Sequence, residues 1–278
     1  MSERASQPRP RRASLWSFLW RRPWFKRLFY EGLGLLLLLR RGMQVLNCGF
    51  HEPSYPAFPL PPEYEPERLG LQLYHKLVAG ADLAGRDVLE TGCGRGGGAR
   101  VLTGLYRPAS YTATDASRMF MWACRWRHQQ PNLRFIATAA CPLPFPDASF
   151  DFLLTVEAVN LLADKPGFLA EAARVLRPGG RLLIADYFYT RETSPNAERK
   201  FRAAIAASGL QLVAEENWTD RAVAALEADT PRRRSEIARL PRFLRGPAIS
   251  FAGTTASPLY QQLRDGRAVH LHFDLAKA

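Results

Sequence analysis

The sequence predicts an α/β protein with a parallel sheet and helices on both faces. From residue 66 onward, short apolar segments alternate with segments of helical pattern. A glycine-rich loop, VLETGCGRGGGA over residues 88–99, follows the first apolar segment, and Asp115 ends the second. Ligands of such sheets bind beyond the carboxyl ends of the strands, so we expect the loop and Asp115 to share one site.

The expected elements follow in regular order. Strands are expected over residues 86–91, 110–114, 133–137, 150–156 and 181–186, and helices over residues 66–79, 98–105, 117–129 and 166–176. Pro66 suits the first position of its helix, where an N–H has no partner to lose. Arg-Pro-Gly-Gly at 177–180 is a strong signal for the end of the fourth helix.

The glycine loop satisfies G-x-G-x-x-G, a pattern that fits NAD as well as other nucleotides. Asp115 lies about 20 residues further on, well placed to accept hydrogen bonds from ribose hydroxyls. Glu90 directly precedes the loop, where its carboxylate would repel a pyrophosphate. A cofactor with a positive charge and an amino group meets no such repulsion. The sequence therefore favours S-adenosylmethionine over NAD.

The amino-terminal segment is basic and aromatic. Residues 1–41 contain ten Lys or Arg and two acids, which gives +8 of the net charge of +12. Residues 1–14 are predicted to be disordered. Residues 15–41 interleave aromatic and cationic side chains, as helices at a membrane interface do. Their apolar run, 32–39, is about eight residues long, whereas a spanning helix needs roughly 20.

We therefore expect peripheral membrane contact through residues 15–41, in a protein that is intracellular, either cytoplasmic or on a membrane. Two alternatives stay open: a mitochondrial presequence, and packing of the leucine run on the domain. Nucleic acid is not an expected partner, because the basic residues accompany leucines and form no binding motif. Four separated cysteines predict free thiols, and no metal site is expected.

Four motifs carry a resemblance to a known class. VLETGCGRGGG, YTATDAS, LPFPDASFD and FLAEAARVLRPGGRLLIADY resemble successive motifs of class I S-adenosylmethionine-dependent methyltransferases. MQVLNCGF, LQLYHKL and GGGARVLTGLYRPASYT resemble the phthiotriol/phenolphthiotriol dimycocerosate methyltransferases, over residues 43–278. The resemblance implies methylation of a hydroxyl on a long lipid. Residues 1–42 lie outside it.

The resemblance also implies a Rossmann-like seven-stranded sheet whose last pair is antiparallel, with strands six and seven at 210–215 and 268–275. A helical cap over the acceptor would occupy about 217–265, with helices at 218–227 and 231–240. Its candidate pocket residues are Phe243, Leu244, Ile249, Phe251 and Tyr260. Packing on the core is an equally good interpretation of these side chains.

Cofactor roles follow from the resemblance by position. Gly92, Gly94 and Gly96 would let the backbone approach the cofactor. Glu90 would order the loop and receive the cofactor's amino group, and Asp115 would hold the ribose. Phe50 would cover the methionine end.

Ala139 stands where the family usually has an Asp that accepts from the adenine amino group, a loss of about 0.5–1.5 kcal/mol. The backbone of Ala140 or the side chain of Thr138 is expected to compensate in part.

A second departure concerns the acceptor. Close relatives read E-A-S-H where this chain reads Glu157-Ala-Val-Asn160. Asn160 cannot take a proton at neutral pH, although it can orient a hydroxyl. Asp186 is the best remaining carboxylate. His75 and His51 are weaker substitutes, because a lone His on a helix is more often structural. Glu157 fits the acceptor pocket or a structural role, and we favour the latter.

Three functions remain in view. The first is methylation of a hydroxyl on a lipidic acceptor, with a carboxyl or a carbon as the less favoured target. The second is a catalytically impaired methyltransferase-like scaffold, motivated by Ala139 and Asn160. The third, NAD-dependent reduction, is disfavoured by Glu90. The oligomeric state is left open.

Overall fold

The computed structural model describes residues 31–32, 42–190 and 197–278. The predicted disordered tail at 1–14 lies outside the described residues, as does the predicted interfacial helix at 15–41 except for Glu31 and Gly32. Across the described ranges, no helix has both the length and the apolar character needed to cross a bilayer.

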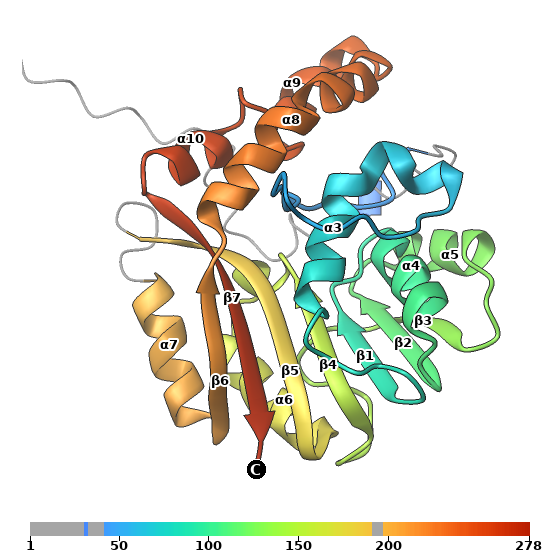
Figure 1. Ribbon diagram of the computed structural model, residues 1–278, viewed down its shortest axis with the longest axis vertical. Helices are drawn as coiled ribbons and strands as arrows, with labels where there is room; N and C mark the ends of the chain where they lie inside the picture. Colours follow the sequence, from blue (N-terminus) through green and yellow to red (C-terminus); the bar gives the residue numbers. More distant parts are fainter. Residues whose placement is uncertain (1–30, 33–41, 191–196) are drawn as a thin grey trace, which may run out of the picture.

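Seven strands form one sheet in the order β3-β2-β1-β4-β5-β7-β6 (Figure 1). β1 to β5 run parallel, and β7 is antiparallel to both of its neighbours. The Rossmann-like class with an antiparallel last pair is thus confirmed. The strands are β1 (Asp87–Thr91), β2 (Ser110–Asp115), β3 (Leu133–Ala137), β4 (Phe150–Val156), β5 (Leu176–Tyr189), β6 (Leu210–Asn217) and β7 (Ala268–Lys277).

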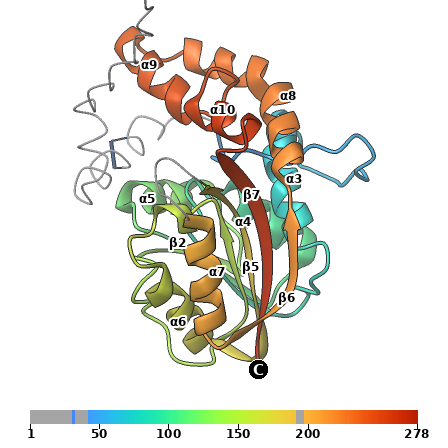
Figure 2. The ribbon, with the colours of Figure 1, turned by 90° about the vertical axis from the view of Figure 1, so that its left-hand side faces the viewer.

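Helices cover both faces of the sheet. Figure 2 shows α6 and α7 on one side and α3 on the other. The helical elements are η1 (Pro62–Glu67), α3 (Arg68–Leu77), α4 (Gly97–Tyr106), α5 (Arg118–Arg127), η2 (Val159–Leu161), α6 (Lys165–Val175), α7 (Ala197–Ala207), α8 (Thr219–Ala238), α9 (Arg242–Phe251) and α10 (Pro258–Arg264).

Alternation along the strands builds two cores. In β4, Leu154 packs with side chains of α3, α4 and α5, whereas Leu153 packs with side chains of α6 and α7. Successive side chains of a strand point to opposite faces, so a strand buried on both sides is apolar throughout. This explains why the central strands are visible in the sequence as continuous apolar runs.

Two elements begin elsewhere than predicted. Pro66 lies inside the 3-10 helix η1, and α3 begins two residues later, at Arg68. α6 ends at Val175, one residue before its expected end, and β5 begins at once at Leu176 and runs through the Pro-Gly-Gly segment. A register shift between Phe150 and Phe152 accommodates these extra residues against β4.

The cap region also differs from its prediction. One helix, α8, spans the two that were expected and contains Pro231. Proline removes one backbone donor from a helix interior. Side-chain bonds bridge this point, because Arg233 donates to Asp229 at 2.8 Å and the Thr230 hydroxyl donates to the Leu226 carbonyl at 2.6 Å.

Helices α8, α9 and α10 lie over the end of the sheet where the parallel strands terminate (Figure 1). Tyr260 packs with Leu226 and Cys48, and its hydroxyl donates to Glu227 at 2.5 Å. This favours the packing interpretation of Tyr260 over a pocket role. Leu244 and Ile249 are half-buried, and the side chains of Phe243 and Phe251 lie outside the described ones.

We predict that Phe201→Ala destabilises the protein strongly. Phe201 is 1% exposed and stacks on Phe188 at 4.9 Å between ring centroids. Loss of a buried phenyl ring typically costs about 3–5 kcal/mol of unfolding free energy. Urea denaturation of the variant measures the loss. Val213→Ala, at a side chain 57% exposed, is the control and should change stability by less than about 0.5 kcal/mol. A loss below about 1 kcal/mol for Phe201→Ala would contradict the packing of α7 on the sheet.

Candidate active site

The glycine loop between β1 and α4 adopts left-handed backbone conformations. φ is +75° at Gly92, +53° at Gly94 and +75° at Gly96, values that L side chains rarely adopt. A Cβ at Gly92 would lie 2.3 Å from the Cβ of Ala158, whereas one at Gly94 would meet only Leu46, at 4.0 Å. The loop is therefore packed on one side and open on the other, at Gly94.

Asp115 lies at this loop, as predicted. Its Oδ2 accepts from the Gly94 amide at 3.0 Å and its Oδ1 from the Ser117 amide at 2.9 Å. Burial raises the pKa of Asp115, and these two amides oppose the rise. The carboxylate thus joins the end of β2 to the open part of the loop.

Glu90 is fully buried beneath the loop. Tyr74 donates its hydroxyl to Oε1 and Tyr111 donates to Oε2, each at 2.9 Å. Burial raises the pKa of Glu90 to about 7, against the lowering effect of the two hydroxyls. These bonds connect Glu90 to α3 and β2. That it orders the loop and receives the cofactor's amino group stays a prediction.

The sequence analysis missed both tyrosines. Each lies inside a motif quoted above, LQLYHKL and YTATDAS, so a signal was available. Tyr74 also fills the space above Gly98, where a Cβ would lie 2.3 Å from its ring. Gly98 is therefore needed for α3 and α4 to approach each other, and Tyr74 connects this packing to Glu90.

Glu31 is a further unexpected neighbour. Its carboxylate accepts from the amides of Arg118 at 2.8 Å and Met119 at 3.0 Å, at the first turn of α5. A carboxylate is favoured there by the unpaired amides and the helix dipole. Its negative charge also raises the pKa of Asp115, after the larger effect of burial.

Phe50 is buried against Trp218 and Tyr55, at centroid distances of 5.3 and 5.8 Å. Its role over the methionine end of a cofactor stays a prediction. Near Asp115, the Thr138 amide donates to the Asp115 carbonyl at 3.0 Å. The next two residues are Ala139, which is exposed, and Ala140, which is half-buried, and their contact with adenine stays a prediction.

Asp186 lies within β5, and Asn160, four residues after the end of β4, meets it there. The Asn160 side-chain amide donates to Asp186 Oδ1 at 2.6 Å, and its backbone amide donates to Oδ2 at 2.9 Å. The Tyr187 amide is a third donor, at 2.7 Å. Burial raises the pKa of Asp186 to about 6. The structure thus brings together two of the three predicted catalytic residues.

His75, the third, belongs to an aromatic cluster. Tyr55 Oη lies 2.7 Å from His75 Nδ1, and Phe58 stacks on the ring at a centroid distance of 4.2 Å. Burial lowers the pKa of His75. These contacts support the structural interpretation of His75.

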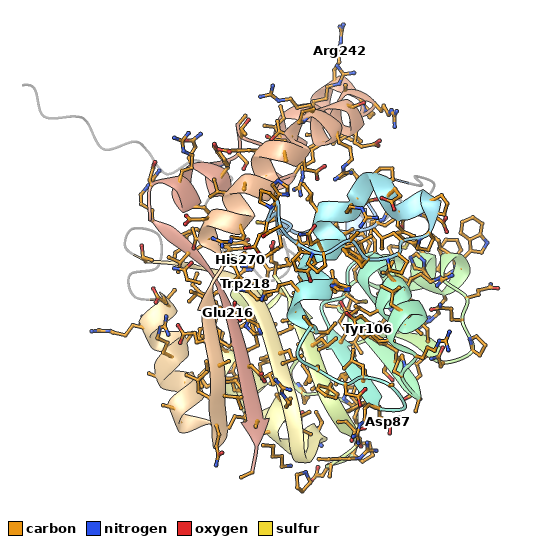
Figure 3. All side chains as sticks on the ribbon, in the orientation of Figure 1. Asp87, Tyr106, Glu216, Trp218, Arg242 and His270 are labelled. Atoms are coloured by element: carbon orange, nitrogen blue, oxygen red, sulfur yellow. The ribbon has the colours of Figure 1, made fainter. Side chains whose placement is uncertain are left out.

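Glu157 and His270 form a second buried pair near Asp186. Glu157 Oε1 lies 3.1 Å from His270 Nε2 and accepts from the Cys48 amide at 2.8 Å. His270 is on β7, at the end of the sheet near Trp218 (Figure 3). No spacing in the sequence connects two residues so far apart, and the sequence analysis missed His270.

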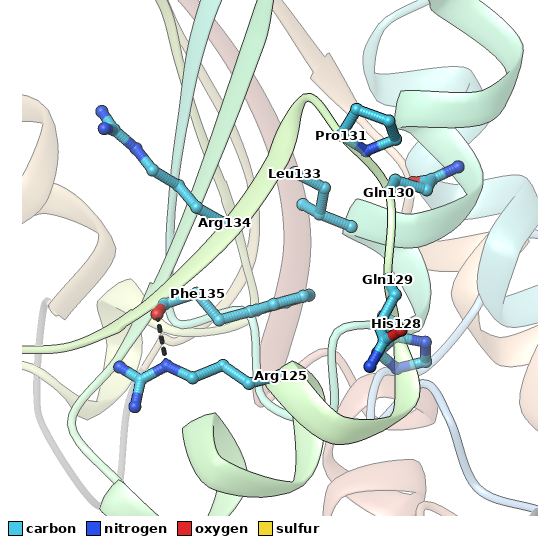
Figure 4. Close-up of a pocket in the computed structure, with 8 residues that line it drawn as sticks. All are labelled: Arg125, His128, Gln129, Gln130, Pro131, Leu133, Arg134 and Phe135. Atoms are coloured by element: carbon cyan, nitrogen blue, oxygen red, sulfur yellow. Dashed lines mark hydrogen bonds between the residues drawn. The ribbon is translucent and has the colours of Figure 1, made fainter.

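A surface hollow of about 550 Å³ lies elsewhere, between α5 and β3 (Figure 4). Arg125 donates to the Phe135 carbonyl at its edge, at 2.9 Å. None of the residues predicted for the cofactor or the acceptor lines this hollow. Its lining residues are Arg125, His128, Gln129, Gln130, Pro131, Leu133, Arg134 and Phe135.

The sheet order, the open glycine loop and Asp115 together define a class I S-adenosylmethionine-dependent methyltransferase, and a family model described as "Methyltransferase domain" matches residues 89–184. The chain belongs to the phthiotriol/phenolphthiotriol dimycocerosates methyltransferase family. It is 40% identical over 214 residues to the "Probable phthiotriol/phenolphthiotriol dimycocerosates methyltransferase 2" of Mycobacterium ulcerans (strain Agy99), which covers 77% of this chain and 81% of that one.

Two further comparisons agree with this class. A fatty-acid O-methyltransferase of Mycolicibacterium smegmatis is 38% identical over 220 residues, 79% of this chain and 78% of that one. The solved structure of a putative sarcosine dimethylglycine methyltransferase from Galdieria sulphuraria superimposes with a TM-score of 0.69 at 16% identity, covering 90% of this chain and 98% of that one. The latter supports the fold alone.

The cofactor is S-adenosylmethionine, which supplies a methyl group on a sulfonium when bound. Gly94 and Asp115 fit this cofactor in two respects. The open space at Gly94 is a cradle that a side chain would fill, and the backbone there can approach a ligand closely. Asp115 places a carboxylate beside that cradle.

We predict that the stability of the protein falls as pH rises through about 7 and that Glu90→Gln removes part of this fall. The folded-state pKa of Glu90 is about 7 against an ordinary value of 4.5, so the folded protein holds an extra proton between these values. The corresponding stabilisation is present at acidic pH and is lost as pH rises. From pH 5 to 8 the variant should gain roughly 3 kcal/mol relative to the wild type.

Urea denaturation at both pH values measures this difference. Glu63→Gln, at an exposed site, controls for the loss of a negative charge. Equal pH dependence of the Glu90→Gln variant and the wild type would contradict the assignment.

Proposed function

We propose that this protein methylates a hydroxyl oxygen of a lipidic acceptor at a membrane surface. The observation that carries the proposal is the hydrogen-bonded pair of half-buried Asn160 and buried Asp186 beside Glu157. Ala158, in the same loop, packs against the position of Gly92, so this polar group lies next to the glycine loop. A polar group there could hold an acceptor oxygen in reach of a cofactor methyl group.

A neutral hydroxyl of the acceptor fits the cluster of Glu157, Asn160 and Asp186 better than a carboxylate of the acceptor does. Glu157 and Asp186 are both buried here, and Glu157 contributes to the raised pKa of Asp186. A third negative charge would be repelled in such surroundings. Both hydrogens of the Asn160 side-chain amide point to acceptors within the group, Asp186 and the Glu157 carbonyl. The side chain therefore has no N–H left to donate to a carboxylate acceptor.

Relatives support a lipidic acceptor, because their names specify phthiotriol dimycocerosates and fatty acids. The basic and aromatic residues of 15–41 support contact with an anionic membrane from the cytoplasm. α5 adds a matching surface, since Trp122 is 53% exposed and Trp126 is 63% exposed, next to the exposed Arg118 and Arg125. Aromatic and cationic side chains together suit the headgroup region.

We predict that Asp115→Asn weakens cofactor binding by roughly 10- to 100-fold, because hydrogen bonds to charged groups contribute about 1.5–3 kcal/mol. Titration calorimetry of S-adenosylmethionine and of its demethylated product into the full-length protein measures both affinities. Asp82→Asn, at an exposed site, is the control and should bind as the wild type does. If the folded wild type binds neither form, the impaired-scaffold alternative replaces this proposal.

A second prediction concerns the acceptor. A long-chain alcohol in anionic vesicles should yield a methyl ether with the wild-type protein, whereas the fatty acid of the same length should yield little methyl ester. Mass spectrometry of the lipid products, with isotopically labelled methyl cofactor, distinguishes the two. Predominant ester formation would show that the acceptor is a carboxylate and would contradict the argument from Glu157 and Asp186.

A further inference from the structure

His270 is a buried histidine with one nitrogen engaged and one not. Its side chain is fully buried, and its Nε2 lies 3.1 Å from Glu157 Oε1. Its Nδ1 is buried and has no hydrogen-bond partner among the described residues. Buried polar atoms without partners are uncommon in folded proteins, and each one calls for an explanation such as a ligand or a catalytic role.

The contact with Glu157 determines the protonation of the imidazole ring. An ionised carboxylate can only accept a hydrogen bond, so Nε2 must carry the hydrogen. In the neutral ring, Nδ1 then carries the lone pair and can accept a proton. Proton uptake at Nδ1 produces an imidazolium, which the adjacent Glu157 carboxylate stabilises. The pair therefore has the arrangement of a histidine base with an orienting acid.

The fold holds both partners in place. His270 pairs with Tyr187 of β5 across the sheet, its amide donates to Thr219 Oγ1 at 3.0 Å, and its carbonyl accepts from the Trp218 amide at 2.8 Å. Glu157 has φ +50°, which is uncommon for a residue with a side chain. Such strain persists where the surroundings require it, and it often marks functional sites.

We propose that His270 is the base that takes the proton from the acceptor hydroxyl and that Glu157 positions it. This rests on the proposed function. As the acceptor oxygen forms its bond to the methyl carbon, the carbon–sulfur bond of the sulfonium breaks and its electron pair stays on sulfur. The hydroxyl proton moves to His270 Nδ1 and is later released to water. One ether, one S-adenosylhomocysteine and one proton result.

The neighbouring groups are less suited to this step. Asp186 already accepts from three donors, two on Asn160 and one on Tyr187. Burial raises the pKa of the Cys48 thiol well above its ordinary value, which keeps it neutral. Asn160 has no basic nitrogen. His270 on β7 would supply the base that position 160 lacks.

Turnover tests the proposal directly. His270→Gln keeps a polar side chain but cannot take a proton, so kcat for the alcohol should fall by about 10²- to 10⁴-fold. Cofactor affinity by calorimetry should stay that of the wild type. His272→Gln removes a histidine of the same strand that stacks on Trp218, and it should retain most of kcat. Unchanged kcat in His270→Gln would overturn the proposal.

A second measurement does not depend on turnover. Nitrogen-15 NMR of the imidazole rings in the full-length protein, with His270 assigned by its absence in His270→Gln, should show a neutral ring protonated at Nε2. Glu157→Gln should change this signal and leave that of His75 as it was. A ring protonated at Nδ1 would overturn the proposal.

The two proposals fail in different ways. If the wild type forms only methyl ester, the hydroxyl specificity is wrong, and His270→Gln should then leave kcat unchanged because a carboxylate needs no base. If the wild type transfers no methyl group, the proposed function fails as a whole. The protonation of His270 alone then decides whether the Glu157–His270 pair has the arrangement of a base.

Discussion

The buried carboxylate of Glu90 constrains the cofactor side of the molecule. A buried ionisable group is costly unless it is hydrogen-bonded, and Tyr74 and Tyr111 are the two donors that satisfy it. These bonds connect α3, the end of β1 and β2 at the base of the glycine loop. The hydrogen bonds of Glu90 therefore connect one helix and two strands at the start of the glycine loop.

Helix α8 of the cap and the segment MQVLNCGF, residues 43–50, form a second connected unit. Arg233 of α8 donates to the Asn47 carbonyl at 2.9 Å and is held by Asp229. The next residue, Cys48, donates its amide to Glu157. α8 is thus linked through Asn47 and Cys48 to Glu157, which follows β4 and has a positive φ. A break of α8 at Pro231 would release Arg233 from these contacts.

The sequence was sufficient for the sheet and the loop but not for the acceptor group. The strands β1 to β4 were predicted almost to the residue, because a strand buried on both faces is a continuous apolar run. Asp115 followed from its place at the end of β2. In contrast, Glu157 and His270 are 113 residues apart and meet only through the pairing of β5 with β7. No local pattern encodes that register.

The remaining errors have similar causes. The extent of β5 through Pro-Gly-Gly depends on a bulge opposite β4, and the continuity of α8 depends on side-chain bonds across Pro231. Both are tertiary effects that override local propensity. Glu90 shows a further case, because the residue was singled out in the sequence, whereas its contact with Tyr74 depends on the packing of α3 on α4.

Glu31 belongs to the amino-terminal segment and acts electrostatically on the predicted cofactor site. Its carboxylate occupies the first turn of α5, and its charge acts on Asp115. A change in the position of residue 31 would alter the electric field at Asp115. Thermodynamic linkage makes such an effect reciprocal, so a ligand that binds at Asp115 would act on the position of residue 31 with the same coupling free energy. Occupancy of the loop and the position of residue 31 would then be two readouts of one equilibrium.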